Sequence, residues 1–87
     1  MNTFQLNISS PDGRIFTGEV SRITVRGAMG DLAVLAGHIP LITSVKAGNC
    51  VLQLEDGSVR RGHTGGGMLT VGKGEVTFLT SSLEWYN

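Results

Sequence analysis

The chain has 87 residues, a formal net charge of zero and a single cysteine, Cys50. This length fits one small domain, expected to span residues 1–87. The seven basic residues are balanced by seven acidic ones, which argues against a general nucleic-acid binder or a polybasic membrane anchor, since both need a basic surface. A lone cysteine excludes an internal disulfide and favours a reducing compartment, and no apolar run approaches the roughly 20 residues of a membrane-spanning helix.

The first third of the chain predicts two strands joined by a tight turn. Residues 3–9 alternate between apolar and polar side chains, which is the pattern of a half-buried strand. The segment Pro11-Asp12-Gly13 predicts a turn, because proline fixes φ and glycine accepts a positive φ. Residues 14–26 predict a second strand, in which the apolar positions change from even to odd numbers between Val20 and Ile23. This change of face predicts a β-bulge or a bend.

The middle of the chain predicts shorter strands separated by loops. These strands are expected around Leu32 and Val34, at residues 41–46, and around Cys50, Leu52 and Leu54. The Asp56-Gly57 pair favours a type I′ hairpin turn, which leads into a return strand at residues 58–63. A break at residues 65–67 is followed by a second hairpin over residues 68–80.

The composition and the spacing of the turns indicate the fold class. Glycine supplies 13 of the 87 residues, about twice its usual share of roughly 7%. With turn signals throughout, the chain predicts an all-β fold, a two-sheet β-sandwich of about 8–10 short strands. The apolar residues expected in its core are Phe4, Leu6, Ile8, Val25, Leu52, Leu54, Leu69, Val71, Val76 and Phe78.

Candidate catalytic and metal-binding residues are few. The two histidines, His38 and His63, form no zinc-binding spacing with Cys50, and no Gly-x-Ser-x-Gly turn activates a serine. The glycine-rich run at residues 62–67 precedes a strand rather than a helix, so it indicates a bulge or a close backbone approach rather than a phosphate loop. The sequence therefore predicts no catalytic residue, no metal site and no cofactor.

One apolar segment, residues 37–43, has two interpretations. Proline cannot donate a hydrogen bond to a sheet, so Pro40 places this segment at a sheet edge or between strands. The residues alone favour filling of the core by the apolar side chains on either side of Pro40. An exposed apolar edge would instead mark a site for a partner.

Four motifs follow one another along nearly the whole chain. They are Phe16-Thr17-Gly18-Glu19-Val20, Gly27-Ala28-Met29-Gly30-Asp31-Leu32, Ala36-Gly37-His38-Ile39-Pro40-Leu41, and Gly66-Gly67-Met68-Leu69-Thr70-Val71 with Val76-Thr77-Phe78-Leu79. Their order and separation resemble the epsilon subunit of F-type ATP synthases. Three positions differ from the usual pattern of that family: Ala36 replaces a proline, Asp31 replaces a glutamate, and Met29 stands where a polar or acidic residue is common.

The resemblance implies a non-catalytic rotor part of a proton- or sodium-translocating ATP synthase. In this family the sandwich sits at the foot of the central stalk, held by the gamma subunit and touching the c-ring of the membrane sector with its bottom loops. Carried over to this chain, it implies a gamma-subunit contact by Ser10, His38, Ile39, Leu41 and Thr43 and a c-ring contact by Ala28, Met29 and Asp31. It also implies a peripheral location on the cytoplasmic face of the bacterial inner membrane, or on an organellar membrane in a eukaryote.

The resemblance also sets an expectation for the end of the chain. The family usually continues into a two-helix hairpin that binds ATP in some members, and we expect this C-terminal helical hairpin to be absent. We therefore expect no ATP binding, no nucleic-acid binding and no direct membrane insertion. The competing hypothesis is a surface or secreted β-sandwich module that binds protein or carbohydrate, which would place aromatic residues on exposed loops.

Overall fold

The computed structural model describes residues 2–86, which form nine strands connected by short turns and loops. The strands are β1 (Phe4–Ser10), β2 (Gly13–Gly27), β3 (Gly30–Leu35), β4 (Leu41–Val45), β5 (Gly48–Leu54), β6 (Val59–Thr64), β7 (Gly67–Val71), β8 (Glu75–Thr80) and β9 (Leu83–Trp85). No helix occurs among residues 2–86, so the predicted all-β fold is confirmed.

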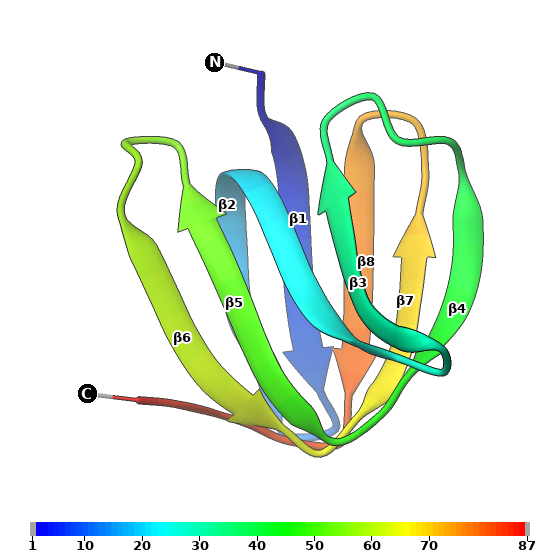
Figure 1. Cartoon of the computed structure of the whole chain (residues 1–87). Coiled ribbons are helices and arrows are strands. Elements are labelled where there is room, and N and C mark those ends of the chain that lie inside the picture. Colours follow the sequence, from blue (N-terminus) through cyan, green and yellow to red (C-terminus); the bar gives the residue numbers. More distant parts are fainter. Residues whose placement is uncertain (1, 87) are drawn as a thin grey trace.

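One continuous sheet folds over into the two layers of a sandwich (Figure 1). The first layer contains β4, β7, β8, β1 and the first half of β2, in that order. The second layer contains β3, the second half of β2, β5, β6 and β9. All neighbouring strands are antiparallel except β1 and β8, which are parallel. The predicted sandwich of short strands is confirmed.

Strand β2 belongs to both layers because it contains a bulge at Ser21. Val20 pairs with Leu54 of β5, whereas Arg22 pairs with Gln53, so Ser21 is the extra residue of β2. Val20 and Ser21 are both buried, after which the buried positions continue at odd numbers. The predicted change of face is therefore confirmed, and it is the point at which the chain passes from the first layer into the second.

The core lies between the two layers. Its buried apolar side chains are Phe4, Leu6, Ile8, Val20, Ile23, Val25, Val34, Val45, Cys50, Leu52, Leu69, Val71, Val76 and Phe78. Every predicted core residue is in this set except Leu54, which is only partly buried because β5 ends there. Burial of each Val, Leu, Ile or Phe side chain stabilises a fold by about 1.5–3 kcal/mol, which makes these alternating positions the main source of stability.

The turn between β5 and β6 differs from the predicted type I′. That type needs a positive φ at both central residues, and among residues 2–86 only glycines, including Gly57, have a positive φ. The Asp56 carboxylate instead accepts hydrogen bonds from the Ser58 N–H at 2.9 Å and from the Ser58 hydroxyl at 2.6 Å. The predicted hairpin is confirmed, but its turn type is wrong because these local bonds hold Asp56 in an Asx-type turn.

The glycine-rich run at residues 62–67 lies where β6 leads into β7, at the lower end of the sandwich (Figure 1). The Gly65 N–H donates to the Ser82 carbonyl oxygen, and the Ser81 N–H donates to the Gly66 carbonyl oxygen, both at 3.0 Å. A Cβ atom on any of these glycines would collide with neighbouring backbone or side-chain atoms. The predicted close backbone approach is confirmed.

Two buried hydroxyl groups form hydrogen bonds between the two layers at this end of the sandwich. The Oγ1 atoms of Thr64 and Thr80 are 2.6 Å apart, and the Thr64 Oγ1 also accepts a hydrogen bond from the Gly66 N–H at 3.0 Å. The Thr80 hydroxyl lies 2.9 Å from the carbonyl oxygen of Gly66. No buried side-chain nitrogen or oxygen of the described residues lacks a hydrogen-bond partner. The two layers are therefore joined by polar contacts as well as by the apolar core.

Candidate interaction surface

The residues with catalytic potential do not gather at one place. Cys50 is buried in the core, and burial raises the pKa of its thiol to about 12, so it is no thiolate nucleophile at neutral pH. His38 lies in the loop between β3 and β4, whereas His63 pairs with Asn49 on the second layer. Within residues 2–86, no group of three His, Cys, Asp or Glu side chains is placed to hold a metal ion. Nor does this part of the chain contain a helix with the length and apolar character needed to span a membrane.

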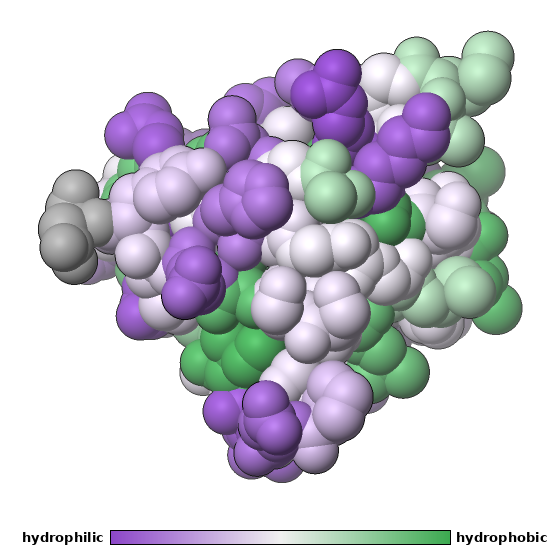
Figure 2. All heavy atoms as spheres, turned by 90° about the horizontal axis from the view of Figure 1, so that it is seen from below, coloured by the Kyte–Doolittle hydropathy of each residue, from purple (hydrophilic) through white to green (hydrophobic). Residues whose placement is uncertain are grey.

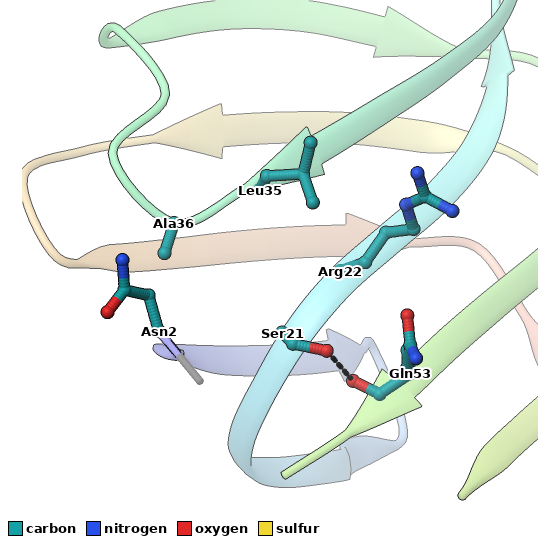
Figure 3. Close-up of a pocket in the computed structure, with 6 residues that line it drawn as sticks. All are labelled: Asn2, Ser21, Arg22, Leu35, Ala36 and Gln53. Carbon is teal, nitrogen blue, oxygen red and sulfur yellow. Dashed lines mark hydrogen bonds between the residues drawn. The ribbon is translucent and has the colours of Figure 1, made fainter. Parts of the chain in front are cut away.

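An open hollow of about 400 Å³ lies at the bulge of β2 (Figure 3). It is lined by Asn2, Ser21, Arg22, Leu35, Ala36 and Gln53. The Ser21 hydroxyl already donates to the Gln53 carbonyl oxygen at 3.3 Å, and neither a histidine nor a carboxylate belongs to this lining. Since a serine needs an adjacent base to become a nucleophile, the hollow holds no activated serine.

Exposed apolar side chains gather on the outer face of the first layer. Ile42 of β4, Met68 of β7 and Leu79 of β8 are all exposed. Met68 and Leu79 are cross-strand partners, and Ile42 pairs with Thr70, which lies two residues from Met68 on the same face. Neighbours of this kind are within reach of one another. Ile42, Met68 and Leu79 therefore form one contiguous patch, which we call the apolar corner.

Short hydroxyl side chains surround the apolar corner. Ser44 pairs with Met68, and Thr70 pairs with Thr77 of β8. A hollow of about 390 Å³ continues the corner toward the lower end of the sandwich, and it is lined by Ser9, Ser10, Pro11, Leu79, Thr80 and Ser81. A patch of exposed apolar side chains surrounded by hydroxyl groups is typical of a protein contact surface.

Strand β4 is the outer edge of the first layer and begins directly after Pro40. Ile39 is 74% exposed and Ile42 is 71% exposed, so core filling, which the residues alone favoured, is wrong for both. Leu41 alternates with Ile42 and is partly buried against the core. Because side chains alternate along a strand, Leu41 faces the core, whereas Ile42 faces outward.

The residues predicted to contact the gamma subunit lie in two places. His38, Ile39, Leu41 and Thr43 follow one another through the β3–β4 loop and along β4, beginning at the upper end of the sandwich (Figure 1). Ser10 ends β1 at the lower end and lines the hollow beside Leu79. The outer face of the first layer extends between these two places.

Sequence reasoning missed the apolar corner. A signal for it was present, since Ile42, Met68 and Leu79 are apolar residues directly beside inward-facing positions such as Leu69 and Phe78. An apolar residue at an outward position of a strand is the pattern that would have found this surface. Pairing Met68 with Leu79 also required the β7–β8 register, which the structure supplies.

The residues predicted to contact the c-ring lie at the β2–β3 hairpin. Gly27 pairs with Gly30, so Ala28 and Met29 form a two-residue turn, and the Met29 side chain is fully exposed. The sequence pattern predicts a loop from Gly27 to Leu32 that includes Asp31, but Asp31 belongs to β3 and pairs with Arg26. The pairing of β2 with β3 continues as far as Gly30, which explains this difference. The hairpin turn projects near the lower end of β4 (Figure 1).

At the lower end of the molecule, residues predicted to contact the gamma subunit lie close to those predicted to contact the c-ring. A hollow of about 200 Å³ is lined by residues 27–32 of the hairpin and by Thr43 of β4. The Lys46 N–H, just after β4, donates to the Arg26 carbonyl oxygen at 2.8 Å. Figure 2 shows this end from below, with apolar residues along the right-hand edge, the side that holds β4 in Figure 1.

Comparison with known proteins shows the family of the chain. The family of the ATP synthase delta/epsilon chain β-sandwich domain matches residues 3–86. The chain belongs to this family. The match includes every strand from β1 to β9, so the resemblance inferred from the four motifs is confirmed.

Similar proteins agree with this assignment. The ATP synthase epsilon chain, sodium ion specific, of Acetobacterium woodii is 37% identical over 83 residues, which are 95% of this chain and 62% of that protein. The ATP synthase epsilon chain of Clostridium perfringens strain 13 is 35% identical over 85 residues, which are 98% of this chain and 64% of that protein. The chain thus spans less than two thirds of the length of these relatives.

Solved structures share the fold. The Euglena gracilis mitochondrial ATP synthase, an OSCP/F1/c-ring assembly, contains a chain that matches with a TM-score of 0.90 and 26% identity, covering 95% of this chain and 53% of that chain. A chain of the Tetrahymena thermophila mitochondrial ATP synthase central stalk and c-ring matches with a TM-score of 0.76 at 14% identity, covering 92% of this chain and 64% of that chain. The second likeness concerns the fold alone.

Proposed function

We propose that this chain is a non-catalytic subunit of the rotor of a proton- or sodium-translocating F-type ATP synthase. Its role is to couple the gamma subunit to the membrane c-ring during ATP synthesis and hydrolysis. The observation that carries the proposal is membership of the delta/epsilon family over residues 3–86, in a chain that exposes an apolar corner on one layer. The similar Euglena structure is an assembly that includes F1 and a c-ring, which supports the same role.

The build of the sandwich suits a part that transmits torque. Its close-packed core lies between two layers that share the bent strand β2. At the lower end, the Thr64–Thr80 contact and the paired backbones around Gly65 and Gly66 join the layers again. Because close-packed interiors transmit strain, a load applied to one layer reaches the other without a soft hinge.

In this proposal the gamma subunit binds the first layer. The surface comprises Ser10, His38, Ile39, Leu41 and Thr43, extended by the apolar corner Ile42, Met68 and Leu79. Exposed apolar side chains at the centre of an interface commonly dominate its binding energy. Leu41 and Thr43 are half-buried and support β4 from its inner side, while Ile39 and Ile42 present the exposed apolar contacts.

The c-ring contact in this proposal is the β2–β3 hairpin, through Ala28, Met29 and Asp31. Met29 supplies a fully exposed apolar side chain at the turn, and Asp31 supplies a carboxylate two residues later. An exposed ion pair of Asp31 with the ring would contribute only about 0.2–1 kcal/mol, so the proposed contact includes the apolar side chain of Met29 as well. The subunit then lies peripherally at the membrane, on the cytoplasmic face in a bacterium, as one domain over residues 1–87.

The competing hypothesis, a binding module for protein or carbohydrate, gains no support from the aromatic residues. Phe4 and Phe78 are buried in the core. Phe16 and Trp85 pack edge to face with ring centroids 6.4 Å apart, and both are partly buried. Tyr86 is exposed, but its hydroxyl donates to the Asn49 side chain at 2.9 Å. These contacts engage the aromatic side chains within the fold.

Binding to the gamma subunit of the same organism tests the proposal. We expect the wild-type chain to bind the purified gamma subunit, and Ile39→Asp and Ile42→Asp each to weaken the affinity about tenfold, which corresponds to about 1.4 kcal/mol. Val59→Asp is the matched control, since Val59 is a half-exposed apolar residue of the second layer. Circular dichroism checks the fold of each variant. Failure of the wild-type chain to bind would contradict the proposed role.

A further inference from the structure

The outer face of the first layer carries two carboxylates at the end opposite the apolar corner. Gln5 of β1 pairs with Glu75 of β8 on one side and with Glu19 of β2 on the other. The two glutamates therefore occupy one row across three strands, about 10 Å apart at the usual strand spacing. Leu79 of the apolar corner lies four residues further along β8, about 13 Å from Glu75. Apolar and acidic features are thus separated along one face.

Neutral groups hold both carboxylates in place. The Asn7 side-chain amide donates to the Glu75 carboxylate at 2.8 Å, and the Thr3 hydroxyl donates to the Glu19 carboxylate at 2.8 Å. The Asn7 carbonyl oxygen in turn accepts from the Gln5 amide at 3.2 Å. These bonds orient the two carboxylates, and both donors, the Thr3 hydroxyl and the Asn7 amide, are neutral.

The second layer has a different charge pattern. There Asp31 pairs with Arg26, and Glu84 pairs with His63, so acidic side chains have basic or titratable neighbours. On the first layer the row of Glu75, Gln5 and Glu19 has no such alternation. Arg14 lies near the far end of β1, where it pairs with Ser9. The first layer therefore offers a cationic partner two oriented carboxylates.

We propose that this face recognises a segment of the gamma subunit with two matched features. One is an apolar stripe that covers Ile42, Met68 and Leu79, and the other is a pair of lysine or arginine side chains that reach Glu19 and Glu75. The inference rests on the proposed function and adds the chemistry of the partner's surface to it. The apolar stripe supplies affinity, while the charge pairs set the orientation of docking and speed association, as is usual for charges near the rim of an interface.

Association kinetics with the purified gamma subunit test this division of roles. The double variant Glu19→Gln with Glu75→Gln keeps the side-chain shape and an acceptor oxygen for Thr3 and Asn7. We expect it to lower the association rate about three- to tenfold at low salt and to flatten the dependence of that rate on salt. Ile42→Asp should instead act mainly by speeding dissociation. Glu84→Gln, an exposed glutamate of the second layer, is the matched control and should change neither rate.

Each outcome decides a separate point. A wild-type association rate and salt dependence in the double glutamine variant, with gamma still bound, would overturn the inference and leave the proposed function standing. Slow association of the charge-reversed variant Glu19→Lys with Glu75→Lys that recovers when the facing lysine or arginine side chains of gamma are exchanged for glutamate would support it. Absence of any gamma binding by the wild-type chain would overturn the proposed function and this inference together.

Discussion

Gly67 shows how a single missing side chain permits the sandwich to close. A Cβ atom there would lie closer to the Leu79 carbonyl oxygen than any real contact allows, and the atom that it would meet is backbone, which cannot turn aside. We predict that Gly67→Ala destabilises the fold by about 1–3 kcal/mol, the usual cost of overpacking. Urea unfolding measures this change. Gly72→Ala is the control, because its nearest neighbour would be 3.3 Å away, and a loss as large as that of Gly67→Ala would argue against the steric explanation.

The glycines also show which features of a single residue can be predicted from the sequence and which depend on the fold. The run at residues 62–67 predicts a close backbone approach because it precedes a strand and lacks a phosphate-binding helix. Which atoms approach depends on the neighbouring strands, since the contacts of Gly66 and Gly67 come from residues more than ten positions away. In the same way Met29 and Asp31 are recognisable by motif, but the place of Asp31 in β3 follows from its pairing with Arg26.

At the level of a single hairpin, the turn between β5 and β6 makes the stability of the fold depend on pH through Asp56. Hydrogen bonds from the Ser58 hydroxyl and from its N–H hold the pKa of Asp56 below its usual value. A carboxyl group with a lowered folded-state pKa stabilises the fold above its unfolded pKa, and this stabilisation is lost as the pH falls through the folded pKa. We predict that Ser58→Ala raises the pKa of Asp56 toward its ordinary value. A carboxyl-resolved NMR titration measures it, with Ser44→Ala as a distant control; an unchanged pKa in Ser58→Ala would exclude the hydroxyl as a cause.

Elements with a strong local pattern were predictable, and elements without one were not. Alternation in residues 3–9 and the change of face after Val20 predict β1 and the bulge in β2, because both depend on neighbours in the sequence. Strand β9 has only three residues, and it exists through its pairing with β6 and the position of Arg60 over the Trp85 ring at 4.2 Å. Such long-range contacts leave no periodic signal in so short a segment.

At the scale of the whole molecule, the topology decides which face can meet a partner. The parallel pairing of β1 with β8 joins segments from the two ends of the chain, and it brings Glu19, Glu75 and the apolar corner onto one surface. Period-two alternation shows that a strand has two faces but does not order the strands, so the sequence predicts a sandwich without predicting this surface. The family motifs predict the partners, and the fold adds which residues share one surface.

In its proposed role, this sandwich connects the gamma subunit to the c-ring. Electron cryo-microscopy of the intact ATP synthase from the same organism tests it most directly, because it shows both contacts in one complex. We predict density for this chain at the foot of the stalk, with Ile42, Met68 and Leu79 against gamma and the Ala28-Met29 turn against the c-ring. Finding the outer face of the second layer against gamma, or the chain outside the rotor, would contradict it.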